Sequence, residues 1–600
     1  MWIICFILSL LFFFSGVFLA MISERRKWSG KHPVVWLTLG TVLSSVTGFL
    51  PLYAGFFAGE TASPLKVLLL SLNNTIRLFV VDCDFGTIKD MIADAGYGMQ
   101  NAYSILFSVL YVACPILTFG FVLSFFRNLL ANWRLFFSFG KDIYVFSELN
   151  PKNLALANSI VTNSGKSVIV FTNVDTDDIL FESATSLGAI CFQKDLTSVH
   201  IPTRSRSHFI RFIVQGEDTT KNLSEAIYLA ANRRNQNGNE TLYFFDTTAT
   251  GSALFANPPK RNLIIRHINP KQTLIYETIY QHGMDLFRSA SPIPGTDERL
   301  ISVLLIGLGD YGAEMLKTLI WATQMNGYQT KIRVIERSSE AVEHFQAQCP
   351  GLFDPAINGK RIPGEAQYEL CVSPCMDVFS PEYETYLTQD AADTTYVFIA
   401  LGNDEMNIAA SHKTREIFER MRARTHQKQD AKKPIIKTIV YNSDIIEGLR
   451  EEVNEKEFSP SIEYFGDLNS SYTISNFFHS DLEKAALAVH RAYKGTDPDF
   501  YFCDYNYRSS LSCAIHKKLR HDCGIPGTEK ASRDEMTPQE LENLARLEHR
   551  RWCAYIRGEG YQAGGTKQSR KVDTLAKIHY CLMPYDQLPE DEKKKDYAVL

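Results

Sequence analysis

All the membrane-length apolar sequence of this 600-residue chain lies before Arg127. Three apolar stretches, residues 2–21, 34–57 and 102–126, are each long enough to cross about 30 Å of hydrocarbon as an α-helix. The roughly 470 residues that follow contain no further stretch of this kind. The sequence therefore predicts a transmembrane region with three helices in residues 1–130 and soluble domains behind it.

Basic residues between the first two apolar stretches predict how the chain is oriented. Arg25, Arg26, Lys27 and Lys31 lie there with a single acid, Glu24. Because short cationic loops stay on the cytoplasmic side, we expect a multi-pass protein of the cell membrane with its N-terminus outside and its soluble domains in the cytoplasm. A cleaved signal peptide is the alternative, and it is disfavoured because no positive charge precedes the first apolar stretch.

The segment between the second and third stretches contains a further apolar run, residues 65–81, interrupted by Asn73, Asn74 and Arg77. These polar side chains would be costly in lipid, so we expect a re-entrant or interfacial helix. The run Gly96-Tyr97-Gly98 invites comparison with a potassium filter, but Ala93-Asp94-Ala95 precedes it where a filter has Thr-Val or Thr-Ile. We interpret the Gly96-Tyr97-Gly98 string as chance.

Composition excludes some partners and leaves little room for metal. A formal net charge of -5 and an isoelectric point near 6.3 leave no basic footprint for polymeric nucleic acid. Nine of the twelve cysteines follow residue 127, on the side predicted to be reducing, so no disulfide framework is expected. Neither Cys371 with Cys375 nor the group Cys513, His516, His521 and Cys523 has the spacing of a strong zinc motif, and we expect no metal site.

From Asp142 the pattern changes to short β-rich runs separated by helical stretches, which predicts a Rossmann-like, doubly wound α/β domain in residues 141–295. The expected strands are 143–146, 167–171, 189–192, 209–214, 241–245 and 262–266. The first turn, Ser147 to Asn153, contains no glycine, and Pro151 fits the first position of a helix. A scaffold or subunit-contact domain is the better interpretation, because close approach of a pyrophosphate needs glycine here.

A second α/β domain, residues 300–450, has the glycines that the first lacks. Its opening strand, 301–306, runs into Gly307-Leu308-Gly309-Asp310-Tyr311-Gly312, and a helix-compatible segment follows. Such glycines allow a tight turn, backbone access to phosphate and close packing of the helix. Glu336 follows the next strand, 24 residues after Gly312 (336 minus 312), where a carboxylate can accept hydrogen bonds from ribose. The alternative is a degenerate domain that keeps its glycines for packing.

Polar residues also follow a later strand, 396–400, in Leu401-Gly402-Asn403-Asp404-Glu405-Met406-Asn407, ahead of a last expected strand at 435–441. With the glycine loop, this stretch resembles the TrkA-N/RCK family of nucleotide-binding domains attached to ion channels and transporters. The resemblance implies a nucleotide such as NAD, an ADP-ribose derivative or a cyclic nucleotide. The positions it marks for nucleotide binding are Gly307, Gly309, Gly312, Glu336, Asn403 and Asp404. No adjacent base and nucleophile are visible, so we assign no catalytic residues and do not expect an enzyme.

Residues 451–535 are expected to form a connector with a helix from Asp481 to Tyr493. Thr537, Pro538 and Glu540 then predict the start of another helix: a capping threonine, proline at the first helical position and a glutamate that completes a capping box.

The run from Leu544 to Tyr555, with Glu559-Gly560-Tyr561 and residues 577–588, resembles the ryanodine-receptor repeat domain over residues 536–600. The resemblance implies a small, mainly helical module that senses a ligand. The side chains expected to stack a base and pair its phosphate are Glu548, His549, Arg551, Trp552, Tyr555, Tyr561 and Lys577. The alternative is that Glu548, His549 and Trp552 lock their helix into its own core.

These features together predict a membrane effector or channel-like protein gated by a cytoplasmic nucleotide-type ligand. Three spans enclose little by themselves, so a homo-oligomer is expected. The combination of modules suggests bacterial signalling or antiviral defence, on resemblance alone. Two alternatives stay open, a regulatory subunit of a separate ion transporter and a membrane-anchored nucleotide-dependent enzyme.

Overall fold

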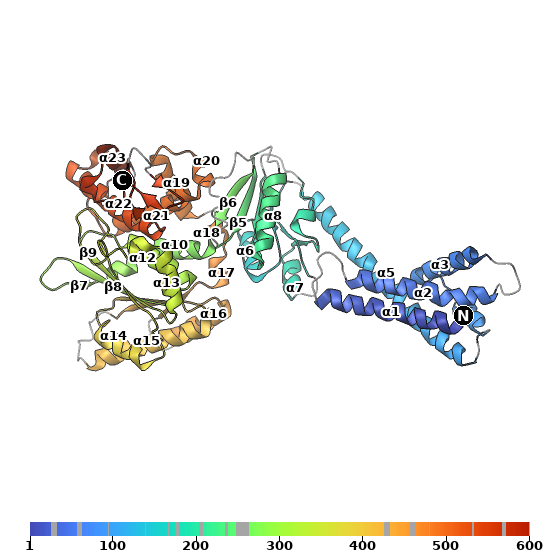
Figure 1. Ribbon diagram of the computed structural model, residues 1–600. Helices are drawn as coiled ribbons and strands as arrows, with labels where there is room; N and C mark the ends of the chain where they lie inside the picture. Colours follow the sequence, from blue (N-terminus) through green and yellow to red (C-terminus); the bar gives the residue numbers. More distant parts are fainter. Residues whose placement is uncertain are drawn as a thin grey trace. The chain divides into compact units, whose positions relative to one another are not determined.

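The computed structural model of the protein describes the chain except residues 26–32, 57–62, 84, 94, 96, 139, 166, 176–178, 203–207, 234–237, 248–262, 425–432, 456–461, 479, 531–532, 567–571 and 599–600. It contains two compact units, Met1–Phe137 and Ser138–Leu600 (Figure 1). Most of the basic loop that predicts the orientation, and Gly96 of the Gly96-Tyr97-Gly98 string, lie outside the described residues.

The first unit is helical. Its elements are α1 (Trp2–Arg25), α2 (Pro33–Phe56), α3 (Pro64–Val80), α4 (Phe85–Ile92) and α5 (Tyr97–Phe136). Three of them contain segments long and apolar enough to cross a membrane, at 2–21, 35–55 and 98–119. The prediction of three apolar N-terminal helices is confirmed. Helix α5, which contains the third apolar segment, continues beyond the expected end of its span, to Phe136. The orientation across a membrane stays a prediction.

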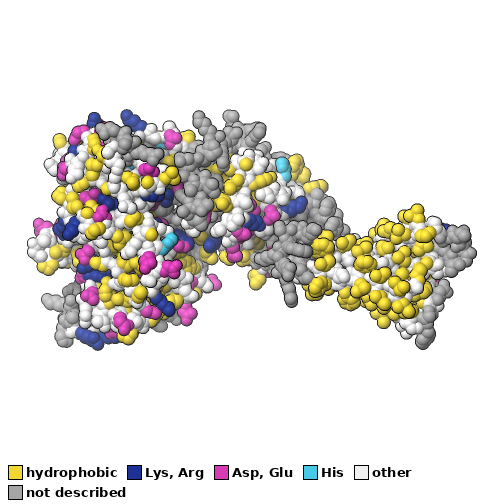
Figure 2. Space-filling view, viewed as in Figure 1, with side chains coloured by type: hydrophobic (Ala, Val, Ile, Leu, Met, Phe, Trp, Pro, Cys, Tyr) yellow, Lys and Arg dark blue, Asp and Glu magenta, His cyan; other side chains and the backbone are white. Residues whose placement is uncertain are grey.

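Small residues let α1 and α2 approach closely. A Cβ atom on Gly16 would lie 2.9 Å from the Cα atom of Gly40, and the hydroxyl of Ser9 donates to the carbonyl of Ser44 at 2.7 Å. Large apolar side chains such as Ile105 and Phe119 stay 67% exposed on this unit, and Figure 2 shows hydrophobic atoms covering its visible face. So large an exposed apolar surface is typical of a membrane-facing or protein-contact region.

The apolar run at 65–81 forms α3, whose first turn is capped by Ser63. The Asn74 amide is satisfied inside the protein, because it donates to the Tyr53 hydroxyl and, at 3.1 Å, to the Leu70 carbonyl. The helix is therefore as expected, and its position relative to a membrane stays a prediction.

The second unit begins with a six-stranded parallel sheet, here called sheet A, in the order β3-β2-β1-β4-β5-β6. Its strands are β1 (Asp142–Phe146), β2 (Ser167–Phe171), β3 (Ile190–Cys191), β4 (Ile210–Val214), β5 (Glu240–Phe245) and β6 (Ile264–Ile268), with α6 (Pro151–Asn163), α7 (Ile179–Ser186), η1 (Leu196–Ser198) and α8 (Thr219–Asn232) in the crossovers. All six expected strands are present with small shifts at their ends, so the doubly wound fold is confirmed.

A second sheet, sheet B, repeats this strand order as β10-β9-β8-β11-β12-β13, with the short β7 antiparallel to β8. Its strands are β7 (Ser291–Pro292), β8 (Arg299–Ile306), β9 (Tyr328–Ile335), β10 (Glu369–Ser373), β11 (Tyr396–Ile399), β12 (Ile435–Ile439) and β13 (Ile462–Phe465). Its helices are α12 (Asp310–Ala322), α13 (Ser339–Gln348), η2 (Pro350–Leu352), α14 (Pro381–Gln389), α15 (Asp404–Arg424) and α16 (Ser443–Glu455). The edge strands β10 and β13 are additions to the expected set.

Helices α10 (Pro270–His282) and α11 (Met284–Ser289) connect the two sheets. The C-terminal part consists of α17 (Leu468–Ser471), α18 (Ile474–Phe477), α19 (Asp481–Ala492), α20 (Asp497–Phe502), α21 (Asp504–Asp522), η3 (Arg533–Glu535), α22 (Pro538–Gly558), β14 (Gln562–Ala563), β15 (Val572–Asp573), β16 (Ile578–His579), η4 (Tyr585–Gln587) and α23 (Glu590–Ala598). The capping box predicted at Thr537 and Glu540 is present. One hydrophobic core joins Leu316 of α12, Leu519 of α21 and Ala554 of α22, so the C-terminal helices pack directly on the second sheet's layer.

Candidate functional site

The carboxyl ends of β8 and β11 lie side by side, because β8 pairs with β9 on one edge and with β11 on the other. The strand order reverses at this point, and open α/β sheets bind ligands in the crevice formed there. The loops that follow these two strands are the glycine loop, Gly307 to Gly312, and the stretch from Leu401 to Asn407. The predicted nucleotide-binding positions therefore meet at the carboxyl ends of the strands of sheet B.

The three glycines of the loop have three different surroundings. Gly307 has φ +91°, and a Cβ atom there would lie 2.3 Å from the carbonyl oxygen of Ala400. A Cβ atom on Gly312 would lie 1.9 Å from the carbonyl oxygen of Gly307. Gly309 is exposed, and a Cβ atom there would meet no atom within 4 Å among the described residues. Sterics thus require glycine at Gly307 and Gly312, whereas Gly309 leaves the backbone open to a ligand.

The N-terminus of α12 points into this opening. Gly309 is the N-cap residue and has no side chain to satisfy the first amide groups of the helix. An uncapped N-terminus of this kind stabilises phosphate through its amides and the helix dipole. Lys271, at the start of α10, pairs with the exposed Asp310 carboxylate and lies 6.0 Å from the centre of the Tyr311 ring. Lys271 is therefore a cation beside the glycine loop, and the sequence analysis did not assign it to the site.

Glu336 lies against the glycine loop, as its position after β9 predicts. One carboxylate oxygen accepts from the Leu308 amide at 2.7 Å, and the other accepts from the Ser338 amide at 2.8 Å. The carboxylate holds the loop in its conformation and keeps lone pairs that a ribose hydroxyl can use. Its partners in the structure are backbone amides, and its binding to ribose stays a prediction.

Asn403 and Asp404 follow β11 at the same edge. The Asn403 side chain accepts from the Met406 amide at 3.1 Å, and the two oxygens of Asp404 accept from the amides of Tyr441 and Asn442 at 2.9 Å. Asp404 thus ties the start of α15 to the loop after β12. The exposed Asn403 is the member of this pair that a ligand in the crevice can reach.

Sequence reasoning did not single out the side chain that organises the second loop. Asn407 is fully buried, accepts from the Leu401 amide at 2.6 Å and donates to the Ile439 carbonyl at 2.9 Å. It therefore links the ends of β11 and β12. The available signal was an asparagine in the first turn of a helix, where this side chain is unfavourable unless it bonds to backbone.

Five of the residues predicted to bind a ligand in the C-terminal module are buried and have partners in the protein: Glu548, His549, Arg551, Tyr555 and Tyr561. Glu548 is 0% exposed and accepts twice from Arg551, at 3.1 and 2.7 Å, while Tyr555 is 2% exposed. His549 reaches the Met583 carbonyl at 2.8 Å and lies 3.5 Å from the Asp596 carboxylate. Burial by itself lowers the pKa of His549, but Asp596 and the carbonyl raise it overall.

The other two, Trp552 and Lys577, lie nearer the surface. The ammonium of Lys577 stands 4.7 Å from the centre of the Tyr561 ring, and the half-buried Trp552 packs edge-on against His579. The seven residues therefore divide into an internal group and a peripheral group. The internal contacts favour the alternative that Glu548 and His549 lock α22 in place, and ligand binding by the seven stays a prediction.

The cysteine and histidine residues considered as possible metal ligands differ in their surroundings. Cys371 is exposed on β10, Cys513 is buried, and His516 is buried against the Gln324 carbonyl at 2.7 Å. Among the described residues no group of three or more His, Cys, Asp or Glu side chains is placed to hold a metal ion.

No protein-family model and no curated protein matches the chain. Among solved structures it is similar to a crystal structure of GsuK bound to ADP, with 14% identity and a TM-score of 0.32 over 73% of this chain and 96% of that chain. A crystal structure of a GsuK point mutant gives 14% identity and a TM-score of 0.30 over 73% and 94% of the two chains. TM-scores this low carry no argument about fold or function.

Proposed function

We propose that this protein is a multi-pass membrane effector or channel-like protein controlled by a cytoplasmic nucleotide that binds at the glycine loop of sheet B. The observation that carries the proposal is the contrast among the loop glycines. Packing alone explains Gly307 and Gly312, but it does not explain Gly309, whose Cβ position is empty. A backbone kept bare beside an uncapped helix N-terminus is the arrangement that admits a pyrophosphate.

The surrounding groups suit the parts of a nucleotide. The amides at the start of α12 and the ammonium of Lys271 provide positive charge for phosphate. Glu336 stands where the carboxylate of such a site accepts from ribose. Asn403 is exposed at the neighbouring loop. The ligand class is therefore a nucleotide such as NAD, an ADP-ribose derivative or a cyclic nucleotide.

Helix α12 is the element that can transmit occupancy of the loop. It begins at Gly309, and near its middle Lys317 pairs with Glu314 at 2.8 Å and lies under Gly558 of α22. Gln272 of α10 donates to Glu314 at 3.2 Å from the other side. A small shift of α12 on binding therefore acts on both α10 and α22. This coupling works only if the ligand binds two conformations unequally, commonly by about 1 to 3 kcal/mol.

The membrane unit is the proposed output. Its apolar surface calls for lipid, and three spans per chain call for several copies around any path across the membrane. We therefore propose a homo-oligomer, with bacterial signalling or antiviral defence as its setting.

The test uses the full chain in detergent and then in liposomes. Binding of NAD, ADP, ADP-ribose and cyclic nucleotides is measured by calorimetry, and ion flux is measured with and without the nucleotide that binds. Gly309→Ala should fold normally and lose the binding step that belongs to the glycine loop, because the added methyl group occupies the approach of the phosphate. Gly165→Ala is the matched control, since Gly165 is also exposed with no atom within 4 Å of its Cβ position among the described residues.

Each outcome decides between the functions considered. Flux that depends on nucleotide in the wild type and is lost in Gly309→Ala supports a channel-like effector. Binding without flux assigns the output to a separate transporter, which this protein would regulate. Consumption of the nucleotide, lost in Gly309→Ala, makes the protein an enzyme. No binding by any nucleotide of the panel overturns the proposal.

A further inference from the structure

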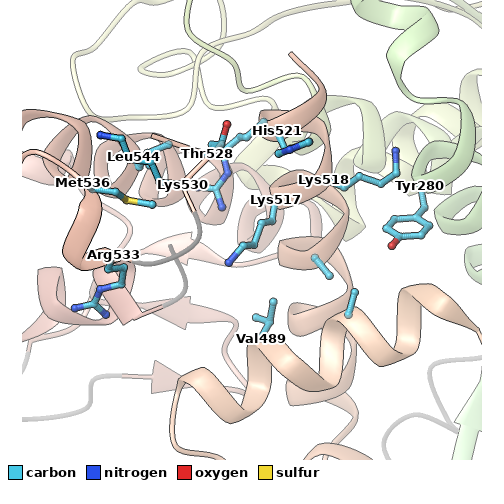
Figure 3. Close-up of a pocket in the computed structure, with 13 residues that line it drawn as sticks. Tyr280, Val489, Lys517, Lys518, His521, Thr528, Lys530, Arg533, Met536 and Leu544 are labelled. Carbon is cyan, nitrogen blue, oxygen red and sulfur yellow. The ribbon is translucent and has the colours of Figure 1, made fainter. Parts of the chain in front are cut away.

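A cavity of about 410 Å³ lies between α19, α21 and the segment that leads into α22, with Tyr280 of α10 at its margin (Figure 3). Its volume is within the range of pockets that hold small organic ligands. It is distinct from the glycine loop, because none of the loop residues lines it. None of the residues predicted for ligand binding in the C-terminal module lines it either.

Six basic side chains line the cavity, and its described lining contains no acidic one. They are Lys517, Lys518, Arg520, His521, Lys530 and Arg533. Three of them lie close to acids outside the lining: Lys518 to Asp522 at 2.5 Å, Lys530 to Glu540 at 2.6 Å and the His521 imidazole to Asp522 at 3.2 Å. Figure 3 shows Lys517 and Lys518 leaving α21 in different directions, with Lys517 reaching toward Val489 and Lys518 lying beside Tyr280.

Arg520 at the base of the cavity has unused hydrogen-bonding capacity. Its side chain is 1% exposed, and its Nε and Nη1 atoms have no hydrogen-bond partner among the described residues. The nearest acid is Glu548, whose Oε2 atom is 3.7 Å from Nη1. The other oxygen of Glu548 is held by Arg551. Two buried guanidinium groups thus share one carboxylate, two positive charges against one negative, and a buried cation without full pairing is costly unless a ligand completes it.

The neighbouring groups respond to this positive charge. Burial and then the charge of Arg520 lower the pKa of Lys517. Burial and then Arg520 and Arg551 hold the pKa of His516 well below its usual value, so this imidazole stays neutral. An anion in the cavity would reverse the effect on Lys517 and satisfy the donors of Arg520.

The rest of the lining is apolar or aromatic. It consists of Tyr280, Ala485, Val489, Ala514, Met536 and Leu544, with the hydroxyl of Thr528 among the basic groups. A purely inorganic anion would leave these surfaces unused. The combination of basic and apolar groups suits a molecule that has both a phosphate and an organic body.

We propose that this cavity is a second ligand site, which binds a small phosphorylated organic molecule of the nucleotide type. Its phosphate contacts Lys517, Arg520 and Arg533, and its body lies against Val489, Met536 and Leu544. Glu548 is then a positioning residue that aims Arg520 from behind. This site goes beyond the nucleotide site of sheet B and does not depend on it.

The test is made in the full chain carrying Gly309→Ala, so that the loop of sheet B cannot contribute. The probes are pyrophosphate, ADP and uncharged adenosine, and the readouts are calorimetric binding and the unfolding midpoint. We expect saturable binding of pyrophosphate, tighter binding of ADP and little binding of adenosine. Lys517→Glu and Arg533→Glu should each weaken ADP binding about tenfold or more, because each removes a charge-assisted contact.

Lys360→Glu, a charge reversal at an exposed lysine of another loop, is the control and should leave binding unchanged. If Lys517→Glu lowers the unfolding midpoint by itself, Lys517→Gln removes the charge with less disturbance and should still weaken binding. The proposal is overturned if neither phosphate probe binds. It is equally overturned if binding is the same in Lys517→Glu, Arg533→Glu and Lys360→Glu. If the wild type binds the probes and the Gly309→Ala chain does not, all nucleotide binding belongs to sheet B. That outcome would contradict a second site.

Discussion

Sheets A and B have the same strand order and differ in what stands at the point where that order reverses. In sheet A, Phe146 pairs with Phe171 and Ile213, and in sheet B, Ile306 pairs with Ile335 and Ile399. Ser147 is therefore the counterpart of Gly307, and Thr172 is the counterpart of Glu336. Equal topology allows the two crevices to be compared residue by residue.

The crevice of sheet A is occupied by the protein's own side chains. The Ser147 hydroxyl oxygen accepts from the Gln215 amide at 3.0 Å, and Asn150 and Asn153 both donate to the Gln215 carbonyl. A Cβ atom on Gly216 would lie 2.6 Å from the Glu148 carboxylate. In sheet B the counterpart of Gly216 is Gly402, and a Cβ atom there, as at Gly309, would meet no atom within 4 Å among the described residues. The same strand order thus produces a crevice in both sheets, and local side chains decide whether the protein or a ligand fills it.

The largest effect should come from closing the tightest contact of sheet B. Gly312→Ala places a methyl group 1.9 Å from the Gly307 carbonyl, so the helix must move away from the strand at a cost of about 3 kcal/mol or more. We expect a strongly lowered unfolding midpoint in a thermal scan. In Gly309→Ala the added methyl group meets no atom within 4 Å among the described residues. This variant should therefore unfold like the wild type. Equal midpoints for the two variants would contradict the division of roles among the glycines.

The next effect tests the filled crevice of sheet A. Asn153 is fully buried and donates to the carbonyls of Glu148 and Gln215 at 2.9 and 2.8 Å. Asn153→Ala leaves both acceptors without this donor and should destabilise the protein by about 2 kcal/mol. Nucleotide binding measured by calorimetry should be unchanged. A loss of binding in this variant would mean that the ligand site belongs to sheet A as well.

These contrasts also show what could be predicted from the sequence. The strands of both sheets and the glycine loop were predictable because apolar runs and a loop pattern are local signals. The cation beside the loop was not, because Lys271 precedes Asp310 by 39 residues and reaches it through the packing of α10 on α12. The basic cavity was missed for the same reason, since its lining runs from Tyr280 to Leu544. Strands β10 and β13 are short edge strands with few buried residues, which weakens their apolar signal.

A smaller effect concerns a buried carboxyl group on α8, a crossover helix of sheet A. Glu225 is 3% exposed, and neither of its oxygens accepts a hydrogen bond from the described residues. Burial raises its pKa to about 7, with Lys221 opposing and Asp195 and Glu148 adding to the shift. The folded protein thus retains a proton that the unfolded chain releases near pH 4.5. Stability should fall as the pH rises from about 4.5 to 7 and then level off.

Glu225→Gln removes this titration. At pH 8 the variant should unfold at a higher temperature than the wild type. The corresponding gain in the free energy of unfolding is on the order of 1 to 2 kcal/mol. At pH 4.5 the two proteins should differ little. Glu182→Gln, at an acid in the first turn of α7, controls for the change in net charge. A pH profile that is unchanged by Glu225→Gln would show that this carboxyl group is solvated.

The smallest expected change distinguishes Glu336, which follows β9 in sheet B, from its counterpart Thr172, which follows β2 in sheet A. Glu336→Gln keeps one oxygen to accept from the Leu308 or the Ser338 amide, so the fold should lose about 1 kcal/mol or less. The negative charge and one acceptor are lost, and we expect nucleotide affinity to fall about fivefold to tenfold in calorimetry. The reason is that a neutral amide has one acceptor oxygen, which cannot hold the loop and accept from two ribose hydroxyls together.

Thr172→Val is the matched change in sheet A. The Thr172 hydroxyl donates within the crevice, to the carbonyls of Phe146 and Ser147 at 3.0 and 2.9 Å, so its loss should affect stability and leave nucleotide affinity alone. If Glu336→Gln changed stability as Thr172→Val does and left affinity unchanged, Glu336 would serve the loop only as a brace. The two crevices would then differ in steric openness, and Gly309, Lys271 and Asn403 would remain the features of sheet B proposed to contact a ligand.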